Sequence, residues 1–163
     1  MSEVDPLLID ATTKIFEDLS DPQTLNSAGN DDWRSTLWSA LEESGLTLAW
    51  VPADNGGSGA SLADGFSILE LAGKFAVPIP LAETLLAGWL LSKSKLKCPS
   101  GMMTVAPTRP RDKIHLTDNN TLVGEVFGIP FANVAENIVV LAHKDDTPHI
   151  ALVSAKDCII KSN

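Results

Sequence analysis

The stretch Leu41–Asp64, LEESGLTLAWVPADNGGSGASLAD, carries the strongest fold signals in this 163-residue chain. A helix that begins at Asn30 or Asp31 is expected to end just before Gly45, because glycine readily adopts the left-handed conformation that follows a last helical turn. Another helix starts at Ser61, with an acidic residue in its first turn near the positive end of the helix dipole. The stretch therefore predicts two helices joined by a loop.

That loop contains Gly56, Gly57 and Gly59 and leads directly to a helix N-terminus. Three glycines in four positions indicate special backbone angles or a close approach, and a glycine-rich loop before a helix can also hold a phosphate group. No lysine follows as in a P-loop, and no strand-to-helix dinucleotide motif surrounds the loop. We therefore favour a structural turn packed against neighbouring helices over a phosphate cradle.

Two further helices are expected in the first half of the chain. The range 6–19 follows an Asp-Pro pair that suits a helix start, and its apolar residues recur on one face. The range 81–92 is apolar almost all round, so it is expected to be buried on most sides. Glu83 and Thr84 are its only polar members before its last residue. Glu83 either stabilises an exposed first turn or, with Thr84, faces a cavity or a ligand.

After Pro99, short runs rich in Val, Ile, Leu and Thr replace the helical periodicity. Turn residues at 118–120 and 143–148 are typical of hairpin loops. Closely spaced strands without helices between them predict an antiparallel barrel or sandwich, although about six strands are few for a closed barrel. The fold class is therefore α+β, with an N-terminal all-helical bundle domain, 1–96, followed by an incomplete antiparallel β-barrel-like domain, 97–163. The expected strands are 102–106, 113–117, 122–126, 137–142, 149–154 and 158–160.

Charge and composition agree with this division. Residues 1–92 hold 3 basic and 14 acidic side chains, whereas residues 93–163 hold 9 and 7. The shift can mark a domain boundary, a linker or a polyanion site. The net charge of −9 argues against nucleic acid as a partner, and the 44% hydrophobic content argues against disorder. No apolar run approaches the roughly 20 residues that span a bilayer, so we expect a soluble cytoplasmic protein without a membrane partner.

Familiar catalytic and metal motifs are missing from the sequence. Its three histidines show no ligand spacing with carboxylates or cysteines. Cys98 and Cys158 are too few and too far apart for a zinc site or a disulfide framework. No Gly-x-Ser-x-Gly elbow or paired acid motif occurs. The residues by themselves therefore nominate no catalytic group and no metal site.

The order of these pieces resembles that of the acyl-CoA dehydrogenases. In that family a helix ends at glycine, an apolar run leads to proline and acidic residues, and Gly-Gly-x-Gly precedes the next helix, as in residues 41–64 here. The stretch 75–91, FAVPIPLAETLLAGWLL, looks like the following helix in one bacterial branch of the family. The resemblance extends over essentially the whole chain and is strongest over residues 40–92.

The resemblance implies an FAD-dependent flavoenzyme of fatty acid or lipid catabolism that removes hydrogens from the α and β carbons of an acyl-CoA thioester. In the family a carboxylate base takes the α proton and flavin N5 accepts the β hydride, so that the cofactor carries the hydride chemistry. A C-terminal helical domain usually supplies the base. The chain stops within what should be the middle β domain, so no catalytic residue is assigned and the chain alone is expected to be inactive.

Two explanations of the missing domain remain open. The chain is either a piece of a longer enzyme or a member of a homo- or hetero-oligomer in which another chain supplies that domain. The alternative function is a non-catalytic partner subunit or scaffold that completes the acyl or flavin pocket of a larger dehydrogenase chain.

The first flavin-side motif of the family, Thr-Glu-Pro-x-x-Gly-Ser-Asp, corresponds to residues 105–112, VAPTRPRD. Pro107 matches, but Val105 replaces the threonine and Pro-Arg replaces Gly-Ser, so hydroxyl groups expected near flavin and its pyrophosphate are lost. Arg111 could compensate by charge, since a guanidinium suits phosphate oxygens, or it could be a solvated loop residue.

The second motif, a Gly-x-Lys-x-Trp-Ile-Thr strand, corresponds to residues 124–132, GEVFGIPFA. Ile129 matches, Pro130 occupies the threonine position, and a glycine occupies the tryptophan position. Phe131 could restore an aromatic surface or pack in the core. The resemblance thus implies flavin contacts at Val105, Pro107, Arg111, Ile129, Pro130 and Phe131, and candidate substrate contacts at Glu83 and Thr84.

Overall fold

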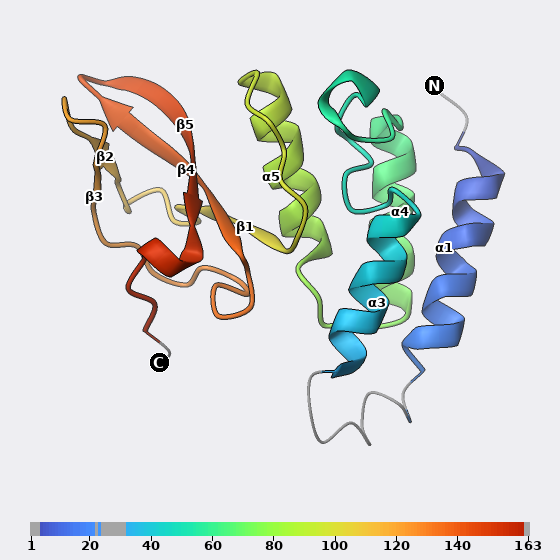
Figure 1. Ribbon diagram of the computed structural model, residues 1–163. Helices are drawn as coiled ribbons and strands as arrows, with labels where there is room; N and C mark the ends of the chain where they lie inside the picture. Colours follow the sequence, from blue (N-terminus) through green and yellow to red (C-terminus); the bar gives the residue numbers. More distant parts are fainter. Residues whose placement is uncertain (1–3, 22, 24–31, 162–163) are drawn as a thin grey trace. The chain divides into compact units, whose positions relative to one another are not determined.

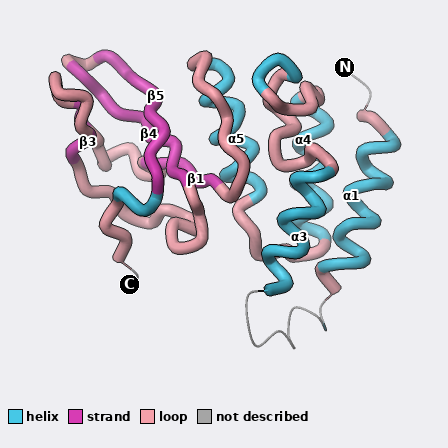
Figure 2. The backbone as a smooth tube through the Cα atoms, viewed as in Figure 1, coloured by secondary structure: helices cyan, strands magenta, loops and turns pink. Residues whose placement is uncertain are grey.

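The structure is a computed structural model that describes residues 4–21, 23 and 32–161. The chain divides between Leu81 and Ala82 into two compact units (Figures 1 and 2). The predicted domain boundary at 96/97 lies further along the chain and remains a prediction. The predicted boundary would place the helix at 81–93 in the first domain, whereas the compact units place nearly all of it in the second.

The first unit is helical, as the sequence predicts. It contains α1 (Pro6–Leu19), α3 (Asp32–Glu43), the 3-10 turn η1 (Ala53–Asn55) and α4 (Leu62–Lys74). The expected start of α3 at Asn30 or Asp31 falls outside the described residues. α1 lies against both α3 and α4 (Figure 1). The side chains of Phe16, Leu37, Leu41 and Ile68 are fully buried.

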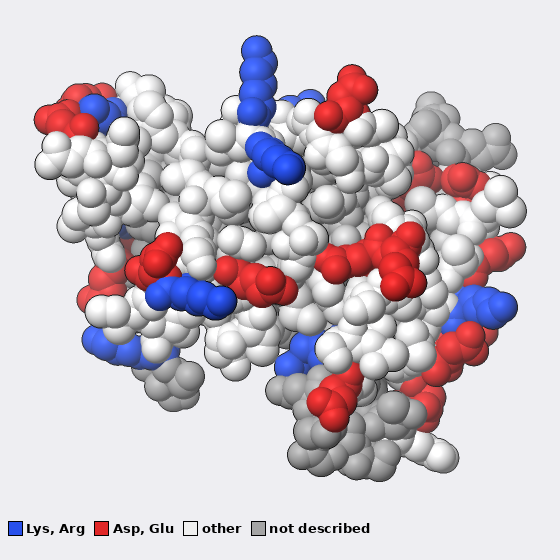
Figure 3. All heavy atoms as spheres, viewed as in Figure 1, with Lys and Arg blue, Asp and Glu red and all other residues white. Residues whose placement is uncertain are grey.

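The unit is also the acidic part of the chain, because residues 1–81 hold 3 basic and 13 acidic side chains. Figure 3 shows acidic side chains spread over the visible surface of the helices rather than gathered at one point.

Asp64 joins the start of α4 to the start of α1. Its carboxylate accepts hydrogen bonds from the N–H of Asp5 at 2.9 Å and the N–H of Ser61 at 2.9 Å. Its own N–H donates to the Ser61 hydroxyl at 3.1 Å, which completes a capping box. The N–H of Asp5, followed by the side chain and N–H of Ser61, lowers the pKa of Asp64. The charged carboxylate is therefore favoured in the folded state.

Asp64→Asn is expected to lower stability at neutral pH and to flatten its acid dependence. Because the folded pKa lies below the ordinary carboxyl value of 3.8, the contribution of Asp64 is fully present above that value and is lost as the pH falls through the folded pKa. Urea midpoints measured from pH 2 to pH 6 test this. Asp54→Asn, at an exposed position of η1, is the control and should keep the wild-type slope. If the urea midpoint of Asp64→Asn depends on pH as steeply as that of wild type, Asp64 is not the group that causes this acid dependence.

The glycine-rich loop folds as a structural turn. The backbone N–H of Gly57 donates to the Pro52 carbonyl at 3.2 Å, and that of Gly59 donates to the Val51 carbonyl at 2.8 Å. A side chain at position 57 would overlap the carbonyl oxygens of Val51 and Leu48. Since a phosphate cradle needs free N–H groups, these hydrogen bonds favour the turn.

The second unit combines one helix with a five-stranded sheet. Its elements are α5 (Leu81–Lys93), which begins at the unit boundary, β1 (Met103–Ala106), β2 (His115–Leu116), β3 (Leu122–Val123), β4 (Asn137–Lys144), β5 (Thr147–Ser154) and the 3-10 turn η2 (Ala155–Asp157). The strand order is β1-β4-β2-β3, and β5 also pairs with β4. The α+β class is confirmed, and the described strands form an open sheet that is not closed into a barrel.

The antiparallel direction predicted for the whole sheet is wrong for two strand pairs. β4 runs parallel to β1, from Met103↔Asn137 to Ala106↔Val140, and parallel to β2. A parallel pair needs a connection of about a dozen residues or more, which residues 107–136 supply. The prediction failed because it assumed that consecutive strands pair. The run 158–160 is not a strand either, since it follows η2 as irregular chain.

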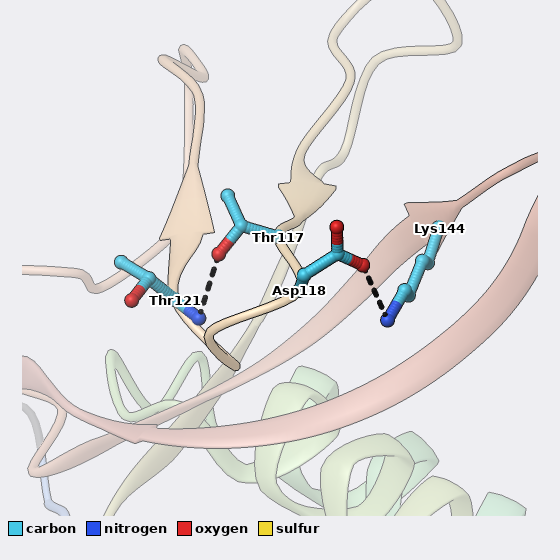
Figure 4. A network of polar contacts seen from close by, with 4 residues as sticks. All are labelled: Thr117, Asp118, Thr121 and Lys144. Carbon is cyan, nitrogen blue, oxygen red and sulfur yellow. Dashed lines mark hydrogen bonds and ion pairs between the residues drawn. The ribbon is translucent and has the colours of Figure 1, made fainter.

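Both predicted hairpin loops are confirmed. Between β2 and β3, the Thr121 N–H donates to the Thr117 hydroxyl at 3.1 Å. Asp118 of the same loop forms an ion pair of 2.9 Å with Lys144 at the end of β4 (Figure 4). The pair is exposed, so it adds at most about 1 kcal/mol. Residues 145–146 link β4 to β5 with positive φ angles of 47° and 62°, as in a tight two-residue turn.

Candidate functional site

The two segments that the resemblance assigns to flavin lie against each other. We call residues 105–112 the arginine segment and residues 127–131 the aromatic segment. The arginine segment continues β1, and the aromatic segment lies within the connection that leads to β4.

Side-chain hydrogen bonds join the two segments at several points. The Thr104 hydroxyl, just before the arginine segment, donates to the Pro130 carbonyl at 2.7 Å. The Thr108 hydroxyl lies 3.2 Å from the Gly128 carbonyl, to which it donates. The sequence does not predict either contact, because the partners lie 26 and 20 residues apart, with the short strands β2 and β3 between them.

An arginine that the sequence did not nominate occupies this junction. The Arg109 guanidinium lies over the Phe127 ring, with Cζ 5.8 Å from the ring centroid. The Phe127 N–H donates to the Asp112 carboxylate at 2.9 Å, so two residues of the arginine segment contact Phe127. The Phe127 side chain is 46% exposed. The two segments therefore place a partly exposed aromatic ring beside a guanidinium group.

The predicted flavin contacts occupy different environments. Val105 and Pro107 are half-buried, whereas Arg111 and Pro130 are exposed. Ile129 packs against the buried sheet cluster formed by Ala106, Ile114, Ile138, Val140 and Ala142, so its side chain serves the core. Phe131 is half-buried and has a φ of 54° in a turn that its carbonyl oxygen stabilises. The exposed aromatic ring is thus that of Phe127, which sequence reasoning missed.

Thr84 and Glu83 differ although they are neighbours on α5. Thr84 is fully buried, and its hydroxyl donates to the Met103 carbonyl at 3.1 Å and accepts from the Met103 N–H at 3.0 Å. This hydroxyl therefore fixes the helix to the outer edge of β1. Glu83 lies half-buried in the first turn of α5. Between the two predicted substrate contacts, only Glu83 has a polar group that the neighbouring strand does not occupy.

The described residues show neither a metal-binding cluster nor a membrane-spanning helix. No group of three or more His, Cys, Asp or Glu side chains in the described part of the chain is placed to hold a metal ion. None of the described helices is both long and apolar enough to span a membrane. Burial raises the pKa of the Cys98 thiol, whose Sγ donates to the Gly88 carbonyl at 3.4 Å.

Comparison with known proteins identifies relatives in one family. No protein-family model matches the chain. Over 90 residues it is 34% identical to acyl-CoA dehydrogenase IpdE2 of Mycolicibacterium smegmatis, covering 53% of this chain and 29% of that protein. The solved structure of the Tcur3481-Tcur3483 steroid ACAD G363A variant matches with a TM-score of 0.70 and 26% identity, over 91% of this chain and 47% of the other. The chain is thus similar in sequence to one acyl-CoA dehydrogenase and in structure to another.

Two further structures, less similar in sequence, share the fold of this chain. One is the ChsE4-ChsE5 complex from Mycobacterium tuberculosis, with a TM-score of 0.73, 20% identity and coverage of 95% of this chain and 48% of the other. The other is TdsC from Paenibacillus sp. A11-2 with FMN and indole, with a TM-score of 0.53, 14% identity and coverage of 93% and 44%. The chain spans about half the length of these structures and less than a third of the curated relative.

Proposed function

We propose that the chain supplies the helical domain and part of the flavin site of an FAD-dependent acyl-CoA dehydrogenase. In its full-length or partnered form the protein would carry out the α,β-dehydrogenation of an acyl-CoA thioester. The observation that carries the proposal is the junction of the arginine and aromatic segments. They are the two stretches that resemble the family's flavin motifs, and hydrogen bonds from Thr108 and from the Phe127 N–H hold them together although the 14 residues 113–126 lie between them.

The groups at this junction fit the diphosphate and the flavin ring of FAD. Guanidinium groups bind phosphate oxygens, and Arg109 and Arg111 are both exposed. Half-open apolar groups suit a flat conjugated ring, and Val105 and Phe127 supply them. When bound, FAD supplies the hydride acceptor. The chain's own residues hold and orient it.

The acyl substrate is proposed on narrower grounds. The description of the Tcur3481-Tcur3483 relative as a steroid ACAD makes a steroid-derived acyl-CoA the first substrate to test. Glu83 is the proposed substrate contact of this chain.

Val105→Thr tests the flavin site by restoring the hydroxyl that the family has at this position. The two side chains have nearly the same shape, so the fold should tolerate the change. We expect purified wild-type chain to bind FAD with a micromolar Kd and an altered flavin spectrum. Val105→Thr should tighten binding by about fivefold, the effect of one net hydrogen bond.

Val123→Thr, on the exposed β3, is the matched control and should leave the Kd unchanged. Equilibrium dialysis together with flavin absorbance gives both readouts. Absence of FAD binding in all three proteins would contradict the proposed function, and equal tightening by both substitutions would contradict the position of the site.

A partner role is the second candidate. It is supported by two similar structures, Tcur3481-Tcur3483 and the ChsE4-ChsE5 complex, each of which has two components. On this proposal the chain completes the acyl or flavin pocket of a larger dehydrogenase chain. Native mass spectrometry distinguishes the two candidates, because a homo-oligomer of this chain loaded with FAD would exclude a purely supporting role.

A further inference from the structure

We infer that Arg109, and not Arg111, is the residue that binds a phosphate group at the junction of the two segments. The inference rests on the proposed function, under which two ligands of the site, FAD and CoA, both contain the diphosphate of an ADP group. The sequence motif drew attention to Arg111. The structure distinguishes the two arginines by what surrounds each guanidinium.

The Arg109 guanidinium has a partner that orients it before any ligand arrives. Its Cζ lies over the Phe127 ring, 5.8 Å from the centroid, and this contact leaves the N–H groups of the guanidinium free to donate. A guanidinium supported in this way loses little rotamer freedom when it binds an anion, so more of the binding energy is retained.

Gly128 provides the room for this arrangement. A Cβ at position 128 would lie 3.2 Å from Arg109 Nη2, and the φ of 66° disfavours any side chain there. Position 128 is the one at which the family motif has tryptophan. The Arg109 guanidinium therefore lies beside the position that the Cβ of that tryptophan would occupy. A glycine at position 128 leaves room for the arginine.

The backbone around Arg109 is fixed as well. The Thr108 hydroxyl donates to the Gly128 carbonyl at 3.2 Å and lies 3.5 Å from the Phe127 carbonyl. The Asp112 N–H donates to the Arg109 carbonyl at 3.1 Å. These bonds close the arginine segment into a turn that holds Arg109 toward the aromatic segment.

Arg111 lacks this support. It is exposed, and no hydrogen bond, ion pair or ring contact holds its side chain among the residues that the structure describes. The nearest acid in sequence, Asp112, accepts the Phe127 N–H and forms no ion pair with either arginine in the described chain. In the described chain, Asp112 therefore neutralises neither guanidinium, and only that of Arg109 is oriented by a neighbouring side chain.

The test compares substitutions that each remove one positive charge from the purified full chain. We measure the Kd of inorganic diphosphate, CoA, FAD and riboflavin by isothermal titration for wild type, Arg109→Gln, Arg111→Gln and Lys113→Gln. Arg109→Gln should weaken diphosphate binding by about tenfold or more, as expected for charge-assisted hydrogen bonds, and leave riboflavin unchanged. Arg111→Gln and Lys113→Gln should weaken it by less than about threefold, since they remove only screened surface charge.

Phe127→Leu tests the contact that orients Arg109. It should weaken diphosphate binding by about threefold, and because leucine keeps an apolar surface, riboflavin binding should weaken but not be lost. A tenfold loss for FAD but not CoA assigns the phosphate to FAD, and the reverse assigns it to CoA.

Equal losses in Arg109→Gln and Lys113→Gln, or a larger loss in Arg111→Gln, would overturn the inference. The proposed function fails separately if wild type binds diphosphate and CoA through Arg109 but binds no FAD. If wild type binds FAD and Arg109→Gln alters neither the Kd of FAD nor that of CoA, the inference alone fails. Wild type that binds none of the four compounds contradicts both.

Discussion

Gly57→Ala is expected to destabilise the helical unit by about 3 kcal/mol or more. The new methyl group would overlap the carbonyl oxygens of Val51 and Leu48, which are backbone atoms that cannot move aside as a flexible side chain would. Relief of the overlap requires the turn to open, and this breaks the hydrogen bond from Gly57 N–H to the Pro52 carbonyl. The costs of overpacking and of the lost hydrogen bond then add.

Gly56→Ala is the control for this prediction. Nothing lies within 4 Å of the position that its Cβ would occupy, so only the positive φ of 89° opposes the substitution. We expect a loss of about 1 kcal/mol. Urea unfolding followed by tryptophan fluorescence compares the two variants. Similar losses for both would show that the loop is not packed as described, and would reopen the phosphate-cradle hypothesis.

Thr84→Val is expected to destabilise the sheet unit by about 3 kcal/mol. Valine fills nearly the same volume, so the cost comes from the two backbone groups of Met103 that lose their partner in a fully buried position. Each buried unsatisfied polar group costs about 1–3 kcal/mol. Because Met103 lies in an edge strand, no other strand of the described sheet can take over these bonds.

Thr84→Ser separates the hydroxyl from the methyl group. Serine keeps both hydrogen bonds and removes one methyl, so a loss of about 1 kcal/mol is expected. Denaturant midpoints from far-ultraviolet circular dichroism provide the comparison. Serine as damaging as valine would indicate that the methyl packing, and not the hydrogen bonds to Met103, fixes α5 to β1.

The helices were predictable because their signals are local. Asp5 caps α1 through the Leu7 N–H at 2.9 Å, and Ser61 caps α4, so the chain marks these starts within a few residues. Gly45 has the left-handed φ of 69° expected after α3. Each of these features depends only on neighbours in sequence. Tertiary packing agrees with these local preferences, so the helices form where the sequence predicts them.

The sheet and the site were less predictable because their decisive contacts are long-range. The parallel pairing of β1 with β4 joins residues about thirty positions apart, and no periodicity in either strand specifies its direction. The contact between Arg109 and Phe127 likewise depends on how the intervening chain returns. Motif matching selected Arg111 because of its position in the motif. It could not detect that Gly128 makes room for Arg109.

The most direct test of the flavin-site proposal is to map FAD binding onto the chain by backbone amide chemical shifts. We predict that FAD perturbs the amides of Thr108, Arg109, Phe127 and Gly128, and leaves the amides of residues 56–60 unchanged. Perturbation confined to residues 56–60 would contradict it, because the glycine-rich loop would then be the phosphate site. So would a spectrum that saturating FAD does not change.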